Sequence, residues 1–230
     1  MMAKDFEERY KPKVVDDIVF ADEHSKNLID ELVSGIRPFP IHEGKCGILL
    51  YGLPGTGKSA LSKLLPDAME MARSGQPAGY EFEYIRVQPN ANGMAMLGKL
   101  ANKSILMPYG ATYHYFVLDE ADNLSLQAMK TLKSVMNTQN CVFILTTNNY
   151  QGIEVGVRSR CHCIPFNAAP AANWLPLARR ILKDADVAGT SDSALLPVIE
   201  AGHGSARDIL DGIVSVVLQL KDSNKDTNVV

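Results

Sequence analysis

A glycine-rich loop that ends in a lysine and a serine is the first feature of this sequence that could do chemistry. Residues 52–59 read Gly-Leu-Pro-Gly-Thr-Gly-Lys-Ser, which fits the spacing G-x-x-x-x-G-K-[ST]. Glycines let successive backbone N–H groups turn toward phosphate oxygens, at the positive end of the helix that follows. Lys58 offers a charge to the β- and γ-phosphates, and the Ser59 hydroxyl offers a ligand to Mg²⁺.

The motif therefore predicts a site for MgATP, with an accidental match in a glycine-rich turn as the alternative. The nucleotide contacts expected from it are Gly52, Pro54, Gly55, Thr56, Gly57, Lys58, Ser59 and Ala60.

Two adjacent carboxylates follow an apolar segment further along the chain. Residues 113–118 read Tyr-His-Tyr-Phe-Val-Leu, and Asp119 and Glu120 come next. Because ligands bind at the carboxyl ends of parallel strands, we expect both side chains beside the glycine loop. Asp119 would hold Mg²⁺ through water, and Glu120 would orient and polarise the attacking water. Standing alone, such a pair is often just a solvated turn, which is the alternative here.

A third apolar run ends in amide side chains. Residues 141–146 are followed by Thr147, Asn148 and Asn149. An amide at this place could bond to the γ-phosphate or to the attacking water. An asparagine-rich turn without a role in the chemistry is the alternative.

A parallel sheet is needed to bring these residues together, and the pattern of the chain predicts one. From residue 46 onward, short apolar runs alternate with segments of helical periodicity, which is typical of an α/β domain with a parallel sheet. Strands are predicted at 46–51, 80–87, 113–118, 141–146 and 161–166, with helices at 58–73, 94–103 and 126–137 between them. Pro66 is expected to kink or end the first of these helices.

Only helical segments follow residue 166, at 171–184, 193–201 and 205–221. We therefore expect an ATPase core over residues 1–167 and a small all-α lid domain over residues 168–222. The polar residues 223–230 are expected to form a flexible tail.

Composition narrows the class of protein. With 230 residues, of which 46% are hydrophobic, the chain can bury a substantial core. A net charge of −3 gives no overall attraction to nucleic acid or to anionic membranes, so a DNA contact must come from a local patch. The four cysteines show no C-x-x-C spacing, no signal peptide is visible, and no apolar run approaches the roughly 20 residues that span a bilayer. These features predict a cytoplasmic protein without a membrane contact.

Two smaller motifs can each be explained without a functional role. Cys161, His162 and Cys163 could suggest zinc, but alternate residues of a strand face opposite sides, so strand packing is preferred. Lys99 and Lys103 form a small basic cluster on a predicted helix, which is either a solvated face or a contact for DNA phosphates.

Over about residues 7–215 the sequence resembles the AAA+ ATPase subunits of DNA sliding-clamp loaders. Residues 118–122, Leu-Asp-Glu-Ala-Asp, match the Walker B sequence of that family as they stand. Residues 8–18 resemble the segment that lines the adenine pocket in the family, which implies contacts from Tyr10, Pro12 and Ile18. Lys11 stands where the family usually has arginine.

The resemblance also assigns three polar residues. The segment 147–161 is similar to the one that joins sensor 1 to the Ser-Arg-Cys motif, which implies that Asn148 is sensor 1 and that Arg160 is the arginine finger offered to a neighbouring subunit. Residues 204–208 resemble the sensor 2 segment, so Arg207 is carried over. A planar, permanently charged guanidinium is suited to gripping phosphate oxygens.

The resemblance implies an ATPase that binds and hydrolyses MgATP at subunit interfaces, in a homo- or hetero-oligomer that acts in DNA replication. DNA and other replication proteins are the possible partners. The family continues into a helical collar domain that this sequence lacks, so the sequence is either truncated or assembles through its ATP interfaces alone. Other DNA-linked AAA+ proteins, such as a helicase loader, a replication-maintenance ATPase or a transposition regulator, remain alternatives. So does a module that uses ATP to assemble and hardly turns it over.

Overall fold

The structure is a computed structural model that describes residues 8–89, 93–187 and 190–227, with side chains up to residue 222. The chain divides into two compact units, each of which is described by itself. They are the sheet unit, made of Glu23–Gly52 and Lys58–Phe166, and the helical unit, made of the described parts of Met1–Asp22, Leu53–Gly57 and Asn167–Val230.

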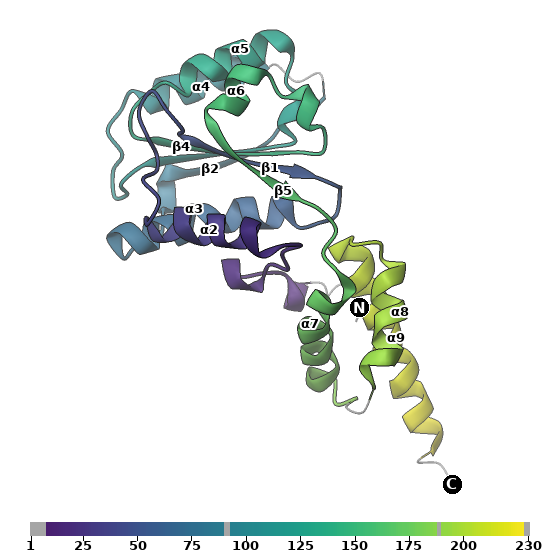
Figure 1. The fold of residues 1–230 in the computed structure, drawn as a ribbon. Coiled ribbons are helices and arrows are strands. Elements are labelled where there is room, and N and C mark those ends of the chain that lie inside the picture. Colours follow the sequence, from purple (N-terminus) through teal and green to yellow (C-terminus); the bar gives the residue numbers. More distant parts are fainter. Residues whose placement is uncertain (1–7, 90–92, 188–189, 228–230) are drawn as a thin grey trace. The chain divides into compact units, whose positions relative to one another are not determined.

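A five-stranded parallel sheet forms the centre of the sheet unit (Figure 1). Its strands lie in the order β2-β3-β4-β1-β5, so β1 lies between β4 and β5. This order places the ends of β1, β3 and β4 side by side at one edge, where the phosphate loop and the carboxylates follow. The strands are β1 (Gly47–Gly52), β2 (Phe82–Arg86), β3 (His114–Asp119), β4 (Cys141–Thr147) and β5 (Cys161–Phe166).

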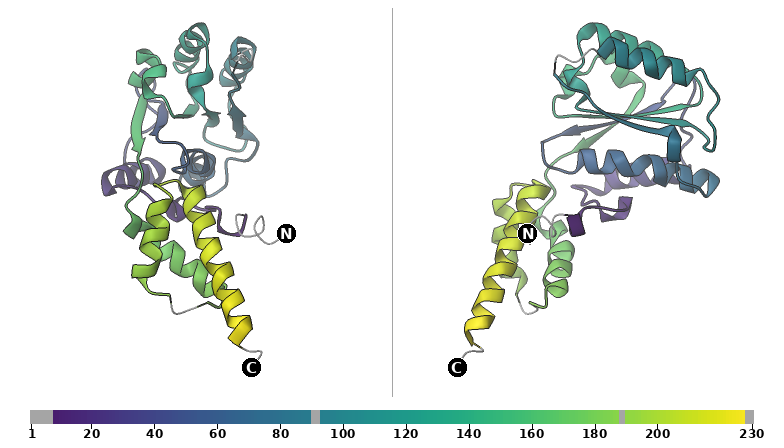
Figure 2. Two further views of the ribbon diagram at one scale, coloured as in Figure 1. Left: turned by 90° about the vertical axis from the view of Figure 1, so that its right-hand side faces the viewer. Right: turned by 180° about the vertical axis from the view of Figure 1, so that it is seen from behind.

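Helices cover both faces of this sheet, as the two views in Figure 2 also show. One face carries α2 (Glu23–Ser34) and α3 (Lys58–Ser74), and the other carries α4 (Gly93–Ser104), α5 (Leu126–Val135) and α6 (Val155–Ser159). Short 3-10 turns complete the unit, namely η2 (Gly79–Glu81), η3 (Ala121–Asn123) and η4 (Tyr150–Gly152).

The core of the sheet unit explains why the strands read as continuous apolar runs. All residues of β3 and β4 are buried, because helices lie on both faces of the sheet. Phe116 and Phe143 pack on neighbouring strands with ring centroids 5.4 Å apart, and Leu97 and Leu132 reach the same cluster from α4 and α5. The predicted α/β fold with a parallel sheet is confirmed.

Most predicted strands agree with the structure to within a residue, but the second does not. Residues 80–87 were expected as one strand, whereas residues 79–81 form η2 and only Phe82–Arg86 pair with β3. The side chain of Tyr80 is almost fully exposed, so its aromatic character does not reflect burial in the sheet.

Pro66 was expected to kink or end the helix, and the prediction that it ends the helix is wrong. The helix α3 continues through Pro66 to Ser74. Proline in a helix interior costs about 3 kcal/mol or more through its lost hydrogen bond and its ring clash. Leu61, Leu65 and Met69 are fully buried along α3, and packing of such an apolar face outweighs an unfavourable local residue.

The cysteine-containing strand packs as predicted. Cys161 lies in the core cluster and Cys163 packs against it, while the His162 ring contacts Phe39 with a centroid distance of 5.7 Å. The two cysteines and the histidine therefore face opposite sides of β5. Across the described part of the chain, no group of three or more His, Cys, Asp or Glu side chains is placed to hold a metal ion.

The helical unit is built on three helices, α7 (Ala171–Asp184), α8 (Asp192–Ala201) and α9 (Ala206–Thr227). Ile209, Ile213 and Val217 of α9 are spaced four residues apart and are fully buried. They join Trp174 from α7 and Leu195 from α8 in one apolar cluster. None of the helices in the described residues is long and apolar enough to cross a membrane.

The N-terminal segment belongs to this helical unit. Tyr10 is buried in its apolar cluster, and the Tyr10 hydroxyl donates to Asp184 Oδ2 at 3.1 Å. Arg180 pairs with Asp17, which lies in the 3-10 turn η1 (Val15–Asp17). Because residues 8–22 and 53–57 group with the helices, the domain limits 1–167 and 168–222 stay a proposal.

The last helix is longer than the sequence predicts. Residues from 223 were expected to form a flexible tail, but α9 extends to Thr227. Their polar composition was interpreted as fraying, although polar residues are equally compatible with an exposed helical end. Residues 228–230 lie outside the described residues.

Candidate nucleotide site

The glycine-rich loop joins the end of β1 to the start of α3, as the motif requires. Gly52, Gly55 and Gly57 have φ values of 140°, 79° and 100°, a backbone region that side chains rarely allow. At Gly52 a Cβ would lie 2.3 Å from the Phe166 carbonyl oxygen, so no other residue fits there. The Thr56 hydroxyl donates to the Leu53 carbonyl at 2.9 Å and closes the turn.

Lys58 is buried at the first turn of α3. Only 6% of the residue is exposed, and its Nζ donates to the Gly52 carbonyl at 3.0 Å. Burial lowers the pKa of the ammonium to about 8, although the negative charges of Asp119 and Asp122 oppose this shift. A buried cation of this kind gains from an anionic ligand that replaces lost hydration.

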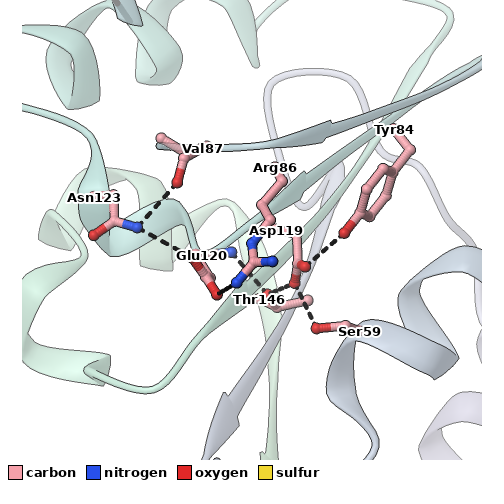
Figure 3. Close-up of polar contacts among 8 residues, drawn as sticks. All are labelled: Ser59, Tyr84, Arg86, Val87, Asp119, Glu120, Asn123 and Thr146. Atoms are coloured by element: carbon pink, nitrogen blue, oxygen red, sulfur yellow. Dashed lines mark hydrogen bonds and ion pairs between the residues drawn. The ribbon is translucent and has the colours of Figure 1, made fainter. Parts of the chain in front are cut away.

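Ser59 and Asp119 meet directly, as Figure 3 shows. The Ser59 hydroxyl donates to Asp119 Oδ1 at 2.7 Å, although 60 residues separate the two in sequence. Thr146 at the end of β4 also donates to Oδ1, and the hydroxyl of Tyr84 donates to Oδ2 at 2.6 Å. Burial opposes ionisation, but the bonds from Thr146, Tyr84 and Ser59 outweigh it and hold the pKa of Asp119 below its ordinary value.

This pair of oxygen donors fits Mg²⁺. In proteins Mg²⁺ usually takes one or two carboxylates together with substrate phosphates and water, rather than a cage of protein ligands. A hydroxyl and an ionised carboxylate in contact supply such a partial set. We therefore assign Ser59 and Asp119 as the residues that would hold the ion.

Glu120 adopts a backbone conformation that is uncommon for a residue with a side chain. Its φ and ψ are 59° and 47°, in the left-handed region, and its N–H donates to Thr146 Oγ1 at 3.0 Å. Such a conformation costs of order 1 kcal/mol and tends to occur at functional sites. The turn directs the Glu120 side chain away from Asp119, so the two carboxylates have different partners (Figure 3).

The carboxylate of Glu120 is held by a cation. Arg86 at the end of β2 donates from Nη2 to Glu120 Oε1 at 2.7 Å, and Asn123 Nδ2 lies 3.4 Å from Oε2. Arg86 is in register with Asp119 across the β2–β3 pair. In this state, therefore, the predicted base is engaged in an ion pair.

Sequence reasoning missed three side chains that contact the carboxylates, namely Tyr84, Arg86 and Thr146. Thr146 is the last residue of a predicted strand, so its place at the carboxyl edge was a usable signal. Tyr84 and Arg86 are two residues apart in β2, so their side chains lie on the same face of the strand. Their strand was predicted too long and without a register, so the sequence gave no reason to place them opposite Asp119.

Asn148 directly follows β4, and β4 is the strand next to β3. Its side chain is exposed. The neighbouring Asn149 is committed to local structure, because its Oδ1 accepts from the Gly152 N–H at 3.1 Å and caps η4. Of the two amides, Asn148 is therefore the one that remains suited to the sensor role, which stays a proposal.

Arg160 lies at the end of the sheet where β1 begins, opposite to the end where the phosphate loop follows β1. Its carbonyl accepts from the N–H groups of Cys46 and Gly47, at the start of β1, whereas the phosphate loop begins at the end of that strand. At about 3.3 Å per residue, the length of β1 separates them by about 17 Å. The guanidinium is held by Asn137 Oδ1 at 2.8 Å and by the Gly156 carbonyl at 2.9 Å.

The remaining predicted contacts belong to the helical unit. Pro12 is partly buried and Ile18 is buried. Arg207 is exposed as the second residue of α9, whose first amide, on Ala206, donates to the Gly55 carbonyl at 2.8 Å. The start of this helix therefore contacts the loop segment Leu53–Gly57, and the sensor 2 role of Arg207 stays a proposal.

One of the two lysines of the predicted basic cluster has local partners. Lys103 Nζ lies 3.5 Å from Glu81 Oε2 and donates to the Tyr80 carbonyl at 3.1 Å. Lys103 therefore contacts the turn that contains Tyr80 and Glu81, whereas Lys99 is exposed. A contact of these lysines with DNA phosphates stays a prediction.

A comparison with protein families decides which group the chain belongs to. The profile described as DNA polymerase III, delta subunit, matches residues 54–170, just over half of the chain. The chain belongs to this clamp-loader family. The match covers residues 54–59 of the glycine-rich loop, both carboxylates, Asn148 and Arg160.

The chain is also similar to individual curated proteins, named as subunits of replication factor C and of DNA polymerase III. It is 27% identical over 226 residues to Replication factor C small subunit 2 of Pyrobaculum islandicum, covering 95% of this chain and 65% of the relative. It is also 27% identical over 200 residues to the DNA polymerase III subunit gamma/tau of Mycobacterium tuberculosis, covering 79% of this chain and 34% of the relative. The chain thus spans less than two thirds of the length of these relatives.

Solved structures confirm the fold of this clamp-loader chain. A mutant of RuvB from Thermotoga maritima superposes with a TM-score of 0.71 at 15% sequence identity, covering 93% of this chain and 68% of that one. At this level of identity the likeness concerns the fold alone. It agrees with a P-loop α/β core followed by helices.

Proposed function

We propose that this chain is an ATPase subunit of a clamp-loader assembly, which binds MgATP at residues 52–59 and hydrolyses it with Asp119 and Glu120. The hydrogen bond between Ser59 and Asp119 carries the proposal, because it joins the phosphate loop to the strand-end carboxylates. Family membership and the replication relatives support the same function.

The residues divide the work as follows. Backbone N–H groups of the loop and the Lys58 ammonium bind the phosphates, while Ser59 and Asp119 would hold Mg²⁺, which would supply positive charge next to the transferring phosphoryl group. Glu120 orients the attacking water and accepts its proton, and Asn148 bonds to the γ-phosphate or to that water. Because Arg86 occupies the Glu120 carboxylate in this structure, hydrolysis requires that ion pair to open.

Further residues would contact the adenine and the γ-phosphate. We assign the adenine to Tyr10, Pro12 and Ile18 and a γ-phosphate contact to Arg207, by resemblance to the family. Arg160 is too far along β1 to serve the phosphate loop of its own subunit, so it serves a neighbour. The active assembly is therefore a homo- or hetero-oligomer joined at its ATP sites.

Two other functions remain to be separated from this one. Another DNA-linked AAA+ protein would share the ATP site but act on a different partner. An assembly module would bind ATP and release almost no phosphate. Steady-state phosphate release with and without primed DNA distinguishes turnover from assembly, and stimulation by primed DNA together with a clamp distinguishes clamp loading from other DNA transactions.

The binding site itself is tested by Lys58→Ala. Losing a charged hydrogen-bond partner costs about 2 kcal/mol, so we expect ATP to bind roughly 30-fold more weakly. Calorimetry measures the change, and Lys99→Ala, which removes an exposed lysine of α4, should bind ATP like the wild type. Equal ATP affinity in the wild type and Lys58→Ala would exclude residues 52–59 as the phosphate site.

The same residue gives ATP binding a pH dependence. With a pKa of about 8 in the free protein, Lys58 is charged below pH 8 and neutral above it. Binding of anionic phosphates above pH 8 must take up a proton, so ATP affinity should fall as the pH rises through this value. In Lys58→Ala the affinity should stay flat over the same range.

An exposed apolar cluster in the sheet unit offers a surface for a partner. Tyr80 is 99% exposed and Tyr109 92% exposed, and three further large apolar side chains accompany them. Internal bonds hold the two segments together, since Glu81 Oε1 accepts from the Tyr109 N–H at 3.0 Å. Exposed patches of this kind mark protein interaction sites. The cluster consists of Tyr80, Ile105, Leu106, Met107 and Tyr109.

We infer that the occupant of this cluster is the sliding clamp, given the family to which the chain belongs. Replacing Ile105, Met107 and Tyr109 together by serine should weaken clamp binding at least ~10-fold, because a few buried apolar anchors dominate such interfaces. Calorimetry with the cognate clamp measures this, and Leu126→Ser, at an exposed leucine of α5, is the control. Unchanged clamp affinity in the triple variant would exclude this surface.

A further inference from the structure

Tyr84 bonds to the oxygen of Asp119 that Ser59 does not touch. The Tyr84 hydroxyl donates to Oδ2 at 2.6 Å, whereas Ser59 and Thr146 both donate to Oδ1 (Figure 3). We propose that Tyr84 is a positioning residue that fixes the Asp119 carboxylate with Oδ1 toward the Mg²⁺ position. This inference rests on the function proposed above and adds a residue to its metal site.

The carboxylate needs such a restraint. The terminal torsion of an aspartate is broad and nearly two-fold, so its two oxygens can exchange places. Donors on Oδ1 alone would not hold Oδ2, and Ser59 must turn its hydroxyl oxygen toward the ion when the ion binds. Tyr84 and Thr146 would then remain as the two donors, one on each oxygen. Asp119 is only 4% exposed, so water cannot replace them easily.

The strand register brings Tyr84 within reach of the carboxylate. Tyr84 lies opposite Val117, and Arg86 lies opposite Asp119. Tyr84 and Arg86 share one face of β2 because side chains alternate along a strand. Arg86 extends to Glu120, which leaves the long phenol of Tyr84 to lean along the strand and meet Asp119.

A lysine holds the ring from the phosphate-loop helix. Lys63 Nζ lies 4.2 Å from the centroid of the Tyr84 ring, a cation–π contact. Ser59 and Lys63 are four residues apart on α3 and therefore share a face of that helix. One helix face thus contacts Asp119 directly through Ser59 and indirectly through Lys63 and Tyr84.

Both the hydroxyl and the ring of Tyr84 have specific partners, Asp119 Oδ2 for the hydroxyl and Lys63 Nζ for the ring. A ring that served packing alone would need neither this hydroxyl nor the cation above it. Residues that hold metal ligands from behind typically account for 10–100-fold in metal affinity or activity.

The test is Tyr84→Phe, which keeps the ring and removes the hydroxyl. Mn²⁺ serves as the probe in place of Mg²⁺, and electron paramagnetic resonance measures its binding in the presence of saturating ADP. We expect Mn²⁺ to bind roughly 10-fold more weakly than in the wild type. ADP affinity measured in EDTA should change less than about two-fold, since the phosphate loop is untouched. Lys63→Met should weaken Mn²⁺ binding by a smaller factor.

Tyr80→Phe is the matched control, because this tyrosine lies four residues earlier in η2 with 99% of it exposed, whereas Asp119 is only 4% exposed. Wild-type Mn²⁺ affinity in Tyr84→Phe would overturn the positioning role and leave the ATPase proposal standing. A loss of ADP affinity in EDTA, or a lower melting temperature with no change specific to Mn²⁺, would show that Tyr84 is structural. Failure of the wild type to bind Mn²⁺ with ADP would instead refute the function itself.

Discussion

A subunit that carries Arg160→Ala is expected to bind ATP with wild-type affinity and to hydrolyse it roughly 10³-fold more slowly. The guanidinium of an arginine finger stabilises charge that develops on the transferring phosphoryl group, so its loss affects the rate and spares ground-state binding. Calorimetry and steady-state phosphate release separate the two effects. A variant that loses ATP affinity instead would show that Arg160 supports the fold of the site.

The position of Arg160 is the reason to expect that it acts on ATP bound to a neighbouring subunit. Arg160 precedes β5 and bonds to the start of β1, while the phosphate loop follows the end of β1, so the strand itself keeps them apart. Specific activity should therefore rise with protein concentration, because dilution separates the finger from the ATP that it serves.

Two variants control for a structural role of Arg160. Asn137→Ala removes the side chain that holds the guanidinium and leaves the finger in place, so hydrolysis should remain within a few-fold of the wild type. Arg160→Lys keeps a charge but lacks the planar fork and should recover little activity. If Asn137→Ala were as inactive as Arg160→Ala, the bond to Asn137 and not the finger would explain the defect.

Glu120→Gln is expected to bind MgATP and to lose hydrolysis by about 10²-fold or more, which is within the range of a positioned general base. The amide is nearly isosteric with the carboxylate but cannot accept a proton from water. Single-turnover phosphate release, with ATP binding measured in parallel, is the appropriate readout.

Arg86→Gln is the matched control for Glu120, because both substitutions break the same ion pair and only one removes the base. With Arg86 replaced, the Glu120 carboxylate no longer takes part in an ion pair with Arg86, so hydrolysis should be retained or raised. Equal loss of activity in the two variants would mean that the ion pair itself, rather than the carboxylate, supports turnover.

The sequence predicted the structure correctly where a local pattern of residues is compatible with only one arrangement of the backbone. The glycine-rich loop between an apolar run and a helical segment predicted its position between β1 and α3, and the alternation of runs predicted the parallel sheet. Asp119 and Glu120 could be placed at the carboxyl edge because strand ends are marked by the change from apolar to charged residues.

Tertiary contacts decided what the sequence could not show. Pro66 carries a strong local signal against a helix, yet the buried face of α3 overrides it. Tyr84 and Arg86 became part of the site only through the register of β2 against β3. Tyr10 has no local mark of its partner Asp184, which is 174 residues distant, so the membership of the N-terminal segment in the helical unit could not be anticipated.

Mixing Lys58→Ala with Arg160→Ala tests the central claim, that the active site is shared between subunits, most directly. The Arg160→Ala subunit binds ATP and lacks the finger, while the Lys58→Ala subunit has the finger and binds ATP poorly. The two variants would be mixed at equal concentrations at which light scattering shows association, and phosphate release would be measured. Activity well above that of either variant alone is the result expected. Activity no greater than the mean of the two separate variants would contradict a shared site.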